Sequence, residues 1–472
     1  MTGPDGELAT DGTTSAAFLR TAFHPSTGEL LVSRTGRIWE AILTAHDAGQ
    51  DGTDHDGVGS IIAILDGEFD LTMIPAGRVH PASRVAASSP SSAGGHGTVV
   101  ALLALAAAPG AQLLLIDVMA GPFVRAAKIA DGLALAAECR AAVVNLSVEF
   151  PTDCAHRDAT WIDSSLALEI DPDPVRFLGE VDAWIAHAEP YAGSRCTRAC
   201  EVCDALARLP GDVLVVAASG NIRDQVCPAC FAGAIGVGFQ RTQRVEVGGI
   251  VLTASGLPET EMGSLVTPEL VVEEPPGFRG TSFASPLVAG LAATLTHPAE
   301  FAATARLPFA LSPLLMLANL FAQHPESVTT RAVTTLQQGF QRFAAAIPAP
   351  HRHWEEAEVT SPCALCALLL VDWYDAFSAT LLAGDSPEAV EQGLGIARIG
   401  AVLAPRSAST AGNVGAGWKR SADFVAGPDR AARLERAHTY FARAADLAPE
   451  VAVYAALRDG IAGSQPDPAP SS

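Results

Sequence analysis

The sequence predicts an α/β domain built on a doubly wound parallel sheet, followed by an all-α helical domain. In roughly the first 300 residues, short aliphatic runs alternate with alanine-rich helical patterns, which implies right-handed βαβ units. After about residue 300 the strand pattern disappears, and helical patterns are separated by proline and glycine. We therefore divide the chain into an N-terminal tail with a lead-in helix (1–57), an α/β domain with an insertion at 150–195 (58–300) and a helical domain (301–472).

Composition and charge narrow the class of protein and its partners. The chain has 472 residues, 49% of them hydrophobic, which is typical of a globular protein with large buried cores. Its formal net charge is −22, so we expect no nucleic-acid partner, because such proteins carry a basic surface. The N-terminus lacks a basic segment followed by an apolar run, so no secretory signal is expected. We expect a cytoplasmic protein with reduced thiols.

One apolar stretch, Val99 to Gly121, approaches the length of a membrane span. Pro109 and Gly110 interrupt it near its middle. We interpret it as a helix, a turn and a buried strand, and we expect no membrane contact.

The first predicted strand, 61–66, is an uninterrupted aliphatic run that ends on Asp66. Such a run indicates a strand buried on both faces, as in a parallel sheet. Further strands of the same kind are expected at 112–117, 142–147, 213–218 and 234–238. Functional groups gather at the carboxyl ends of strands in open α/β sheets, which makes Asp66 a candidate. Taken alone, it could equally cap the next element.

Two predicted helices begin on residues that can carry chemistry. His96 lies between glycines just before the apolar helix at 99–108, where other groups can approach it closely. Ser282 follows Gly280 at the start of a buried alanine-rich helix. A serine there faces free backbone N–H groups and the positive end of the helix dipole, which suits a nucleophile that must stabilise an oxyanion. The alternative is that Ser282 only caps the helix.

Four segments together resemble the subtilisin-like serine peptidases, the subtilases. These are Ile64-Leu65-Asp66-Gly67-Glu68-Phe69-Asp70, His96-Gly97-Thr98-Val99-Val100-Ala101, Ala217-Ala218-Ser219-Gly220-Asn221 and Gly280-Thr281-Ser282-Phe283-Ala284-Ser285-Pro286. The resemblance covers roughly residues 55–300, and the order Asp, His, Ser along the chain is also that of the family. It implies a sheet of subtilisin type.

The resemblance implies a role for each matched residue. Ser282 Oγ would be the nucleophile, and His96 would take its proton and later protonate the leaving amine. Asp66 would hold the imidazole in the useful tautomer. The Asn221 side chain and the Ser282 backbone N–H would form the oxyanion hole. This chemistry requires no cofactor.

Two glutamates depart from the family pattern. Glu68 stands where a small residue is usual, and it could disturb local packing or contact substrate. Glu149 replaces a small residue in the segment that borders the specificity pocket, so it could favour basic residues or point to solvent. The resemblance implies that substrate is contacted by Ser147, Val148, Glu149, Ser219 and Gly220.

The nine cysteines include pairs at metal-site spacing. The leading candidates for a structural zinc site are Cys200, Cys203, Cys227 and Cys230, with Cys196 nearby. One or two disulfides, or unlinked thiols packed as small apolar groups, are the alternatives. Cys363 and Cys366, with His351 and His353 upstream, form a weaker candidate, because the residues around Cys366 indicate a buried helix.

The C-terminal helices suggest a partner-binding domain. Residues 440–449 resemble the second helix of a tetratricopeptide hairpin, and 393–405 is a weaker echo. Helical hairpin arrays bury one face and offer another to peptides, so we expect a protein partner there.

Three functions remain open at this stage. The leading hypothesis is a cytoplasmic serine endopeptidase acting on a protein or peptide, which the intact set of Asp66, His96, Asn221 and Ser282 favours. The rival is a catalytically inactive protein-binding or scaffold protein that keeps the subtilase fold. A third is a maturation protease whose helical domain selects one specific peptide.

Overall fold

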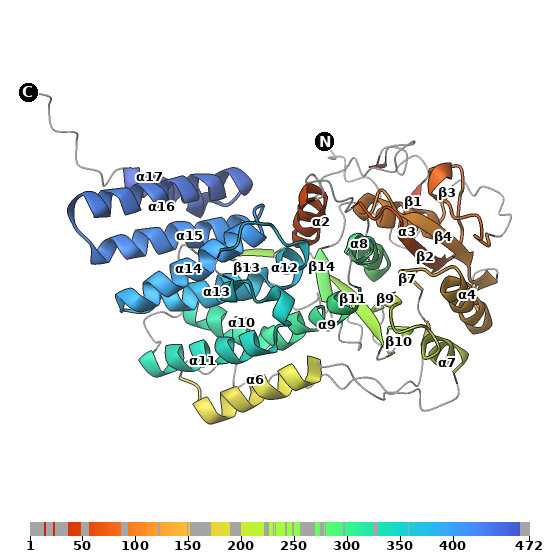
Figure 1. Cartoon of the computed structure of the whole chain (residues 1–472), viewed down its shortest axis with the longest axis horizontal. Coiled ribbons are helices and arrows are strands. Elements are labelled where there is room, and N and C mark those ends of the chain that lie inside the picture. The colour runs from red at the N-terminus through yellow and green to blue at the C-terminus, as the bar shows by residue number, and fades with distance from the viewer. Residues whose placement is uncertain are drawn as a thin grey trace, which may run out of the picture. The chain divides into compact units, whose positions relative to one another are not determined.

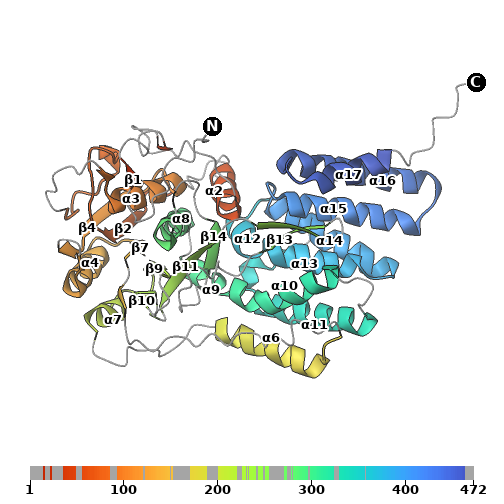
Figure 2. The same cartoon turned by 180° about the vertical axis from the view of Figure 1, so that it is seen from behind.

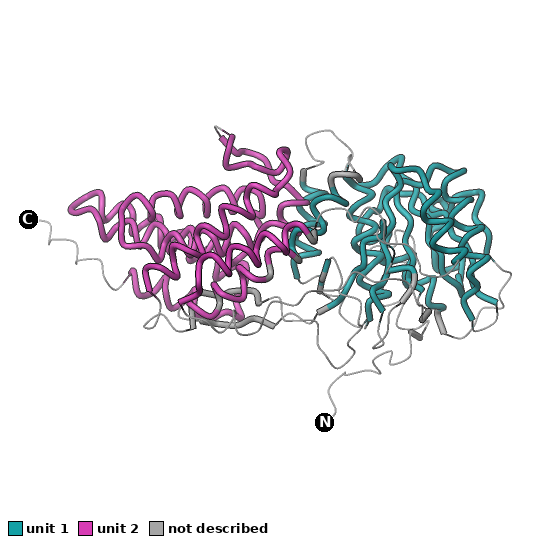
Figure 3. The backbone as a smooth tube through the Cα atoms, turned by 90° about the horizontal axis from the view of Figure 1, so that it is seen from below, with its two compact units in different colours: residues 1–159, 187–242, 255–309 teal, residues 160–186, 243–254, 310–472 magenta. Residues whose placement is uncertain are grey.

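The computed structural model divides the chain into two compact units (Figure 3). Unit 1 comprises residues 1–159, 187–242 and 255–309, and unit 2 comprises 160–186, 243–254 and 310–472. The residues that the structure describes are 14–15, 22–23, 36–48, 56–85, 93–120, 123–148, 150–151, 171–188, 200–220, 226–229, 231, 233–240, 243–247, 250–254, 270–273, 278, 280–295, 298–323, 329–356 and 358–462.

Unit 1 is built on a six-stranded sheet in the order β14-β11-β9-β7-β2-β4, and every pairing in it is parallel. The strands are β2 (Ile61–Asp66), β4 (Gln112–Asp117), β7 (Val143–Leu146), β9 (Leu214–Ala218), β11 (Ala234–Gln240) and β14 (Leu270–Glu273). The predicted doubly wound parallel sheet is confirmed. The chain leaves β2 for β4 on one side and then crosses to β7 on the other. The carboxyl ends of β2 and β7 therefore flank the switch point, where such sheets place their functional groups.

Helices cover both faces of this sheet, as Figures 1 and 2 show from opposite sides. The helices α3 (His96–Ala107) and α8 (Thr281–Thr294) pack together and contact β2. The helices α4 (Ala126–Glu138) and α7 (Glu201–Leu206) share a separate apolar cluster with Leu65, Leu146 and Ala217. Because side chains alternate along a strand, Asp66 and Asn145 point to the face that α8 covers.

One feature anticipated from the sequence appears here as expected. The stretch from residue 99 to 121 forms the body of α3, a turn at 109–110 and then β4. Of the helices that the structure describes, none combines the length and the apolar composition needed to cross a bilayer.

Unit 2 is mainly helical, as predicted for the C-terminal region. Its helices include α11 (Thr330–Ala346), α12 (Ala364–Leu369), α13 (Val371–Leu382), α14 (Pro387–Leu403), α15 (Ala408–Ser421), α16 (Gly427–Leu447) and α17 (Ala452–Ala462). Successive helices from α13 to α17 contact one another, and short connections join them. Four of them begin on a side-chain cap: Thr329, Cys363, Ser386 and Ser407 each accept a hydrogen bond from a backbone N–H three residues on.

Part of the predicted insertion belongs to unit 2. The helix α6 (Pro174–Ala188) places the Phe177 ring against Gly339 of α11, where an added Cβ would come within 3.1 Å of the ring. Arg342 Nη1 also donates to the Leu178 carbonyl at 3.0 Å and pairs with Asp182. These contacts explain why 160–186 groups with the C-terminal helices.

The structure describes further helices and strands. They are β1 (Thr14–Ser15), α2 (Arg37–Ala48), η2 (Ala76–Arg78), β3 (Ala93–Gly94), β5 (Met119–Ala120), β6 (Phe123–Val124), β8 (Phe150–Pro151), β10 (Val226–Cys227), β12 (Gln243–Val247), β13 (Ile250–Ala254), α9 (Pro298–Thr304), α10 (Leu307–Gln323), η5 (Ala349–His351), η6 (His353–Glu355) and η7 (Ala422–Phe424).

Candidate active site

The last residue of β2 bonds to the first residue of α3. His96 Nδ1 lies 2.8 Å from Asp66 Oδ1, and the same oxygen accepts the Gly67 backbone N–H at 2.7 Å. The Asp66 side chain is buried, whereas that of His96 is 24% exposed. Because a carboxylate only accepts hydrogen bonds, Nδ1 carries the proton and a neutral ring keeps a lone pair on Nε2. This arrangement prepares Nε2 to act as a base.

The glycines that flank His96 allow the turn after β2 to approach it. A Cβ on Gly95 would lie 1.8 Å from the Glu68 carbonyl oxygen, and one on Gly97 would lie 2.4 Å from the Gly67 oxygen. The Gly97 N–H donates to that Gly67 oxygen at 2.8 Å. Any larger residue at either position would force this turn away and disturb the Asp66–His96 bond.

Glu68 occupies that turn in an unusual backbone conformation. Its φ is 59°, in the left-handed region that residues other than glycine rarely adopt. Its side chain is exposed, while its carbonyl accepts a hydrogen bond from Thr98 Oγ1 at 3.1 Å. The carboxylate therefore stands in solvent near His96, outside the packed interior.

Close packing of α3 on α8 brings His96 beside the start of α8. A Cβ on Gly290 would come within 2.5 Å of the Ala104 carbonyl oxygen, so only glycine allows this approach. Near the N-termini of the two helices, the His96 and Phe283 rings are in contact, with centroids 5.4 Å apart. Two turns further along, Ala104 of α3 contacts Gly290 of α8. The two helices thus run side by side in the same direction and begin together.

Ser282 lies in the first turn of α8, next to the residue that follows β7. Its Oγ donates to the Ser147 carbonyl at 3.2 Å, and its own carbonyl accepts from Ser147 Oγ at 2.9 Å. The N-cap of α8 is Gly280, and no side chain caps this helix. The interpretation of Ser282 as a helix cap is therefore wrong.

The residues that follow β9 also lie beside the start of α8. Ser219 and Gly220 follow β9, and the Gly220 N–H points to Thr281 Oγ1 at 3.3 Å. Gly220 has a φ of 97°, which lets the chain turn there. Val148, which follows Ser147, is buried. Strand ends β2, β7 and β9 thus bring Asp66, Ser147 and Gly220 to the edge of the sheet where α3 and α8 begin.

A family model supplies the comparison that matters most. The model of the subtilase family, Peptidase_S8, matches residues 78–306, a segment that includes His96 and Ser282. Residues 78–306 therefore match the subtilase family. Asp66 precedes the matched segment, and its assignment depends on its bond to His96.

Solved structures with related folds are distant. The prenylagaramide maturation protease PagA is 18% identical, with 58% of this chain and 86% of that chain covered and a TM-score of 0.30. A lanthipeptide protease is 16% identical, covering 54% and 79% at a TM-score of 0.31. The self-cleaved protease domain of PatA is 18% identical, covering 59% and 96% at 0.32. Similarity at this level says nothing about the substrate of the subtilase domain. Among curated proteins, none matches this chain.

Two predicted site residues lie outside the described residues. They are Asn221, the expected oxyanion donor, and Glu149, the expected specificity residue. Asn221 directly follows Gly220, and Glu149 directly follows Val148; these two are described and lie at the edge of the site. Their roles stay predictions.

The sequence did not reveal the polar residues that hold Ser147 in place. Asn145 Nδ2 donates to Ser147 Oγ at 2.9 Å, and Ser285 Oγ lies 3.0 Å from the same atom. Asn145 is a fully buried polar residue within the aliphatic strand β7, and that interruption was the signal available. A buried amide on the face that α8 covers requires a polar partner on α8 or next to it.

The two predicted metal candidates differ in how the structure places them. Cys200 and Cys203 are free thiols, and Cys203 packs in the apolar cluster beneath α4 and α7. Burial raises the pKa of the Cys200 thiol. The Cys227 side chain and Cys230 lie outside the described residues, so the four-cysteine site stays a prediction. The candidate at residues 351–366, in contrast, brings its side chains together.

Proposed function

We propose that the subtilase domain is a serine endopeptidase with Ser282 as its nucleophile. The observation that carries the proposal is the 2.8 Å bond between the buried Asp66 carboxylate and His96 Nδ1, beside the helix α8 that carries Ser282 in its first turn. A buried acid, an oriented imidazole and a serine hydroxyl at a helix start are the parts that acyl transfer needs.

In the proposed reaction, Asp66 holds the imidazole so that Nε2 can accept a proton. Ser282 Oγ gives its proton to Nε2 and attacks the carbonyl carbon of the scissile bond. The resulting imidazolium is stabilised by Asp66 and then protonates the leaving amine. Water repeats the sequence on the acyl-enzyme and releases the second product.

The oxyanion of the tetrahedral intermediate needs donors already in position. Backbone N–H groups at the start of α8 have no partners within the helix and carry the positive end of its dipole. We assign the Ser282 N–H and the Asn221 side-chain amide to this role. One such donor is worth about 10²–10³ in rate.

Before catalysis, the Ser282 hydroxyl rests in a long hydrogen bond to the Ser147 carbonyl. At 3.2 Å it is weak, so exchanging it for a bond to His96 Nε2 costs little free energy. Meanwhile, the Ser147 Oγ bond to the Ser282 carbonyl keeps the serine backbone in place.

We further propose that the enzyme acts in the cytoplasm on a specific peptide or protein, with unit 2 recruiting the substrate or a partner. The five described free thiols accord with a reducing compartment. The array of packed helices from α13 to α17 offers the kind of extended surface on which other helical arrays bind peptides.

A fluorophosphonate probe tests the catalytic proposal on the full chain. We expect the wild-type protein to be labelled and Ser282→Ala to lose labelling completely, because the probe reacts only with an activated serine. Ser386→Ala is the matched control, since that serine only caps α14. A folded wild-type protein that stays unlabelled under every activating condition would leave the inactive scaffold as the better account.

A further inference from the structure

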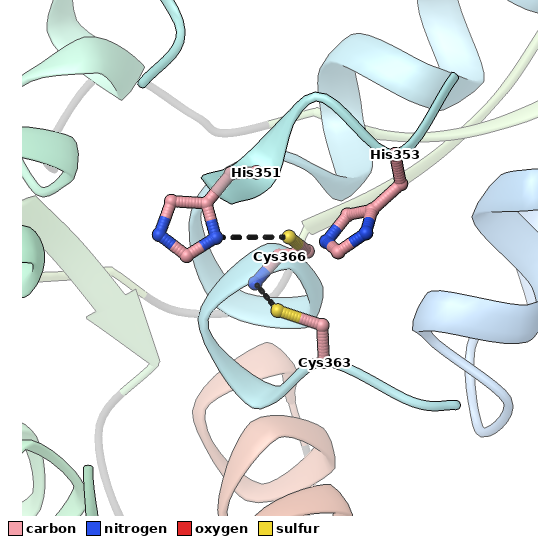
Figure 4. A group of neighbouring side chains, drawn as sticks. All are labelled: His351, His353, Cys363 and Cys366. Atoms are coloured by element: carbon pink, nitrogen blue, oxygen red, sulfur yellow. Dashed lines mark hydrogen bonds between the residues drawn. The ribbon is translucent and has the colours of Figure 1, made fainter. Parts of the chain in front are cut away.

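Four side chains that bind transition metals converge in unit 2 (Figure 4). His351 and His353 come from the 3-10 turns η5 and η6, which follow α11, while Cys363 and Cys366 lie at the start of α12. One nitrogen or sulfur from each residue lies within 4.8 Å of all the others. Cys366 Sγ lies 3.8 Å from His351 Nδ1.

These separations suit a single tetrahedral ion. Zinc bonds of about 2.3 Å to sulfur and about 2.0 Å to nitrogen place the ligand atoms of a tetrahedron roughly 3.3–3.8 Å apart. The widest separation, up to 4.8 Å, needs to contract by about 1.0–1.5 Å to reach that geometry. Two thiolates with two imidazoles form a donor set typical of structural zinc. We propose that His351, His353, Cys363 and Cys366 bind a structural Zn²⁺.

The two sulfurs lie close together at the start of α12. The Cys366 backbone N–H donates to Cys363 Sγ at 3.3 Å. A hydrogen bond from the Cys366 side chain holds the pKa of the Cys363 thiol well below its usual range, against the opposing effect of burial. Burial, with the Cys363 charge beside it, raises the pKa of Cys366 well above its usual range. A Zn²⁺ ion placed between the four side chains would stabilise both sulfurs as thiolates.

His353 has the outer contact that metal-bound histidines usually have. Its Nδ1 lies 2.6 Å from Glu356 Oε1. That carboxylate fixes the proton on Nδ1, so that a neutral ring keeps its lone pair on Nε2. His353 Nε2 is buried and has no hydrogen-bond partner among the described residues. A metal ion would satisfy this atom.

The segments that carry the four ligands are held by neighbouring helices. Arg352, between the histidines, donates from Nε to the Ile347 carbonyl at 2.6 Å and so ties the turns to the end of α11. The Trp354 ring packs on Trp373 of α13, with centroids 4.6 Å apart. The Cys363 N–H donates to the Leu403 carbonyl at the end of α14 at 3.0 Å. The ion would therefore cross-link an already ordered junction.

The chief chemical alternative is a dithiol that cycles through a Cys363–Cys366 disulfide. Unequal thiol pKa values also occur in redox pairs of Cys-x-x-Cys spacing. Two converging histidines with a carboxylate behind one of them are not needed for that chemistry, but they complete a metal site. Both cysteines are free in the structure.

The test measures zinc in the full chain purified under reducing conditions without added metal. We expect one zinc per chain by elemental analysis, and Co²⁺ in its place should give sulfur-to-cobalt charge-transfer absorption with the intensity of a tetrahedral site. Cys366→Ser should lose the metal, whereas Cys139→Ser and Cys203→Ser should keep it. The Co²⁺ spectrum of the wild type needs no variant and stands even if Cys366→Ser misfolds.

A gentler pair of variants tests the outer contact. Glu356→Gln should weaken zinc binding by about 10–100-fold, as loss of such partners typically does. Glu355→Gln is the matched control, because this neighbouring exposed carboxylate lies 3.7 Å from Arg352 and contacts no proposed ligand. Equal affinities in the two variants would contradict the assigned role of Glu356.

Three results would overturn the proposal. The first is a reduced wild-type protein that holds no zinc and does not bind added Zn²⁺. The second is a zinc that disappears with Cys203→Ser but not with Cys366→Ser. The third is a native Cys363–Cys366 disulfide found by mass spectrometry after alkylation, which would establish the redox pair instead.

Discussion

The two units orient a histidine with the same hydrogen bond and prepare it for different work. In unit 1, Asp66 Oδ1 lies 2.8 Å from His96 Nδ1, and in unit 2, Glu356 Oε1 lies 2.6 Å from His353 Nδ1. In both, the carboxylate holds the proton on Nδ1 and leaves Nε2 as the reactive atom. As we propose, that atom serves the Ser282 hydroxyl beside His96 and a metal ion beside His353.

The difference lies in how each carboxylate is held. Asp66 is buried and 30 residues from His96, so the β2–α3 arrangement must form before the pair exists. Glu356 is 47% exposed and three residues from His353, so one 3-10 turn is enough to make the pair. A buried carboxylate can stabilise an imidazolium that forms during catalysis, whereas an exposed one mainly sets the tautomer of a ligand. The contrast accords with a catalytic role for His96 and a structural role for His353.

The largest effect should follow from weakening the buried pair. Asp66→Asn keeps the shape of the side chain, but it can donate to Nδ1 and stabilise the wrong tautomer. We expect kcat for a peptide substrate to fall by about 10⁴-fold with little change in KM.

Asp117→Asn is the control for that variant. Asp117 lies opposite Asp66 in the register of β2 and β4, yet its Oδ1 accepts from Met119 N–H at 2.9 Å. Its substitution should leave kcat within a fewfold of wild type. If kcat fell by a similar factor in the two variants, carboxylates at the strand ends would act on this site through their electrostatic field, and the hydrogen bond to His96 would not be the cause.

How much of this arrangement the sequence predicts depends on whether topology or local turns bring the residues together. Asp66, His96 and Ser282 were predictable as neighbours, because strand ends and helix starts meet at one edge of a parallel sheet. Neither Asn145 nor Ser285 was predicted as a partner of Ser147, since their pairing depends on the rotation of α8 about its axis.

The proposed metal ligands show the opposite limitation. The cysteines at 200–230 have the stronger spacing pattern, but within the part of the chain that the structure describes, the converging side chains are those of residues 351–366. Their convergence depends on two 3-10 turns that aim His351 and His353 back at α12. The sequence contains no periodic pattern that reports the direction of such turns, and the surrounding apolar residues correctly indicated a buried helix without excluding ligands on it.

A second buried aspartate shows what happens without a basic partner. Asp375 in α13 is bonded to Ser409 Oγ, and burial raises its pKa to about 7, with the nearby Asp372 adding to the effect and hydrogen bonds from Ser409, Thr410 and Asn413 opposing it. In the unfolded chain this group has a pKa near 3.8. The folded state therefore holds a proton that the unfolded state loses between about pH 4 and pH 7, and stability falls as pH rises through that window.

Asp375→Asn should remove this dependence on pH. A shift of about three units corresponds to a free energy on the order of 4 kcal/mol at most, fully expressed above pH 7. We expect the variant to melt at a higher temperature than wild type at pH 8 and at a similar temperature at pH 4. Asp385→Asn, at an exposed carboxylate paired with Arg420, should show neither change. If Asp375→Asn lowered the melting temperature at pH 8, the carboxylate would have to be charged and stabilising in the folded protein.

A smaller effect should come from the hydroxyl that joins β7 to α8. Ser147→Ala removes the donor to the Ser282 carbonyl and the acceptor of Asn145 Nδ2, whose amide oxygen already has no partner among the described residues. An unsatisfied buried amide costs about 1–3 kcal/mol, so the melting temperature should fall. The Ser282 backbone would also lose one anchor, and a misplacement worth about 1.4 kcal/mol in the transition state lowers kcat about tenfold.

Ser60→Ala separates these two consequences. Ser60 Oγ donates to the Ala293 carbonyl at the far end of α8 at 2.9 Å, so its loss removes one hydrogen bond worth about 1 kcal/mol without touching Ser282. Stability should fall in both variants, but kcat only in Ser147→Ala. If kcat and the melting temperature fell together in both Ser147→Ala and Ser60→Ala, Ser147 would stabilise the domain as a whole. The position of Ser282 would then depend on α8 and the Asp66–His96 pair alone.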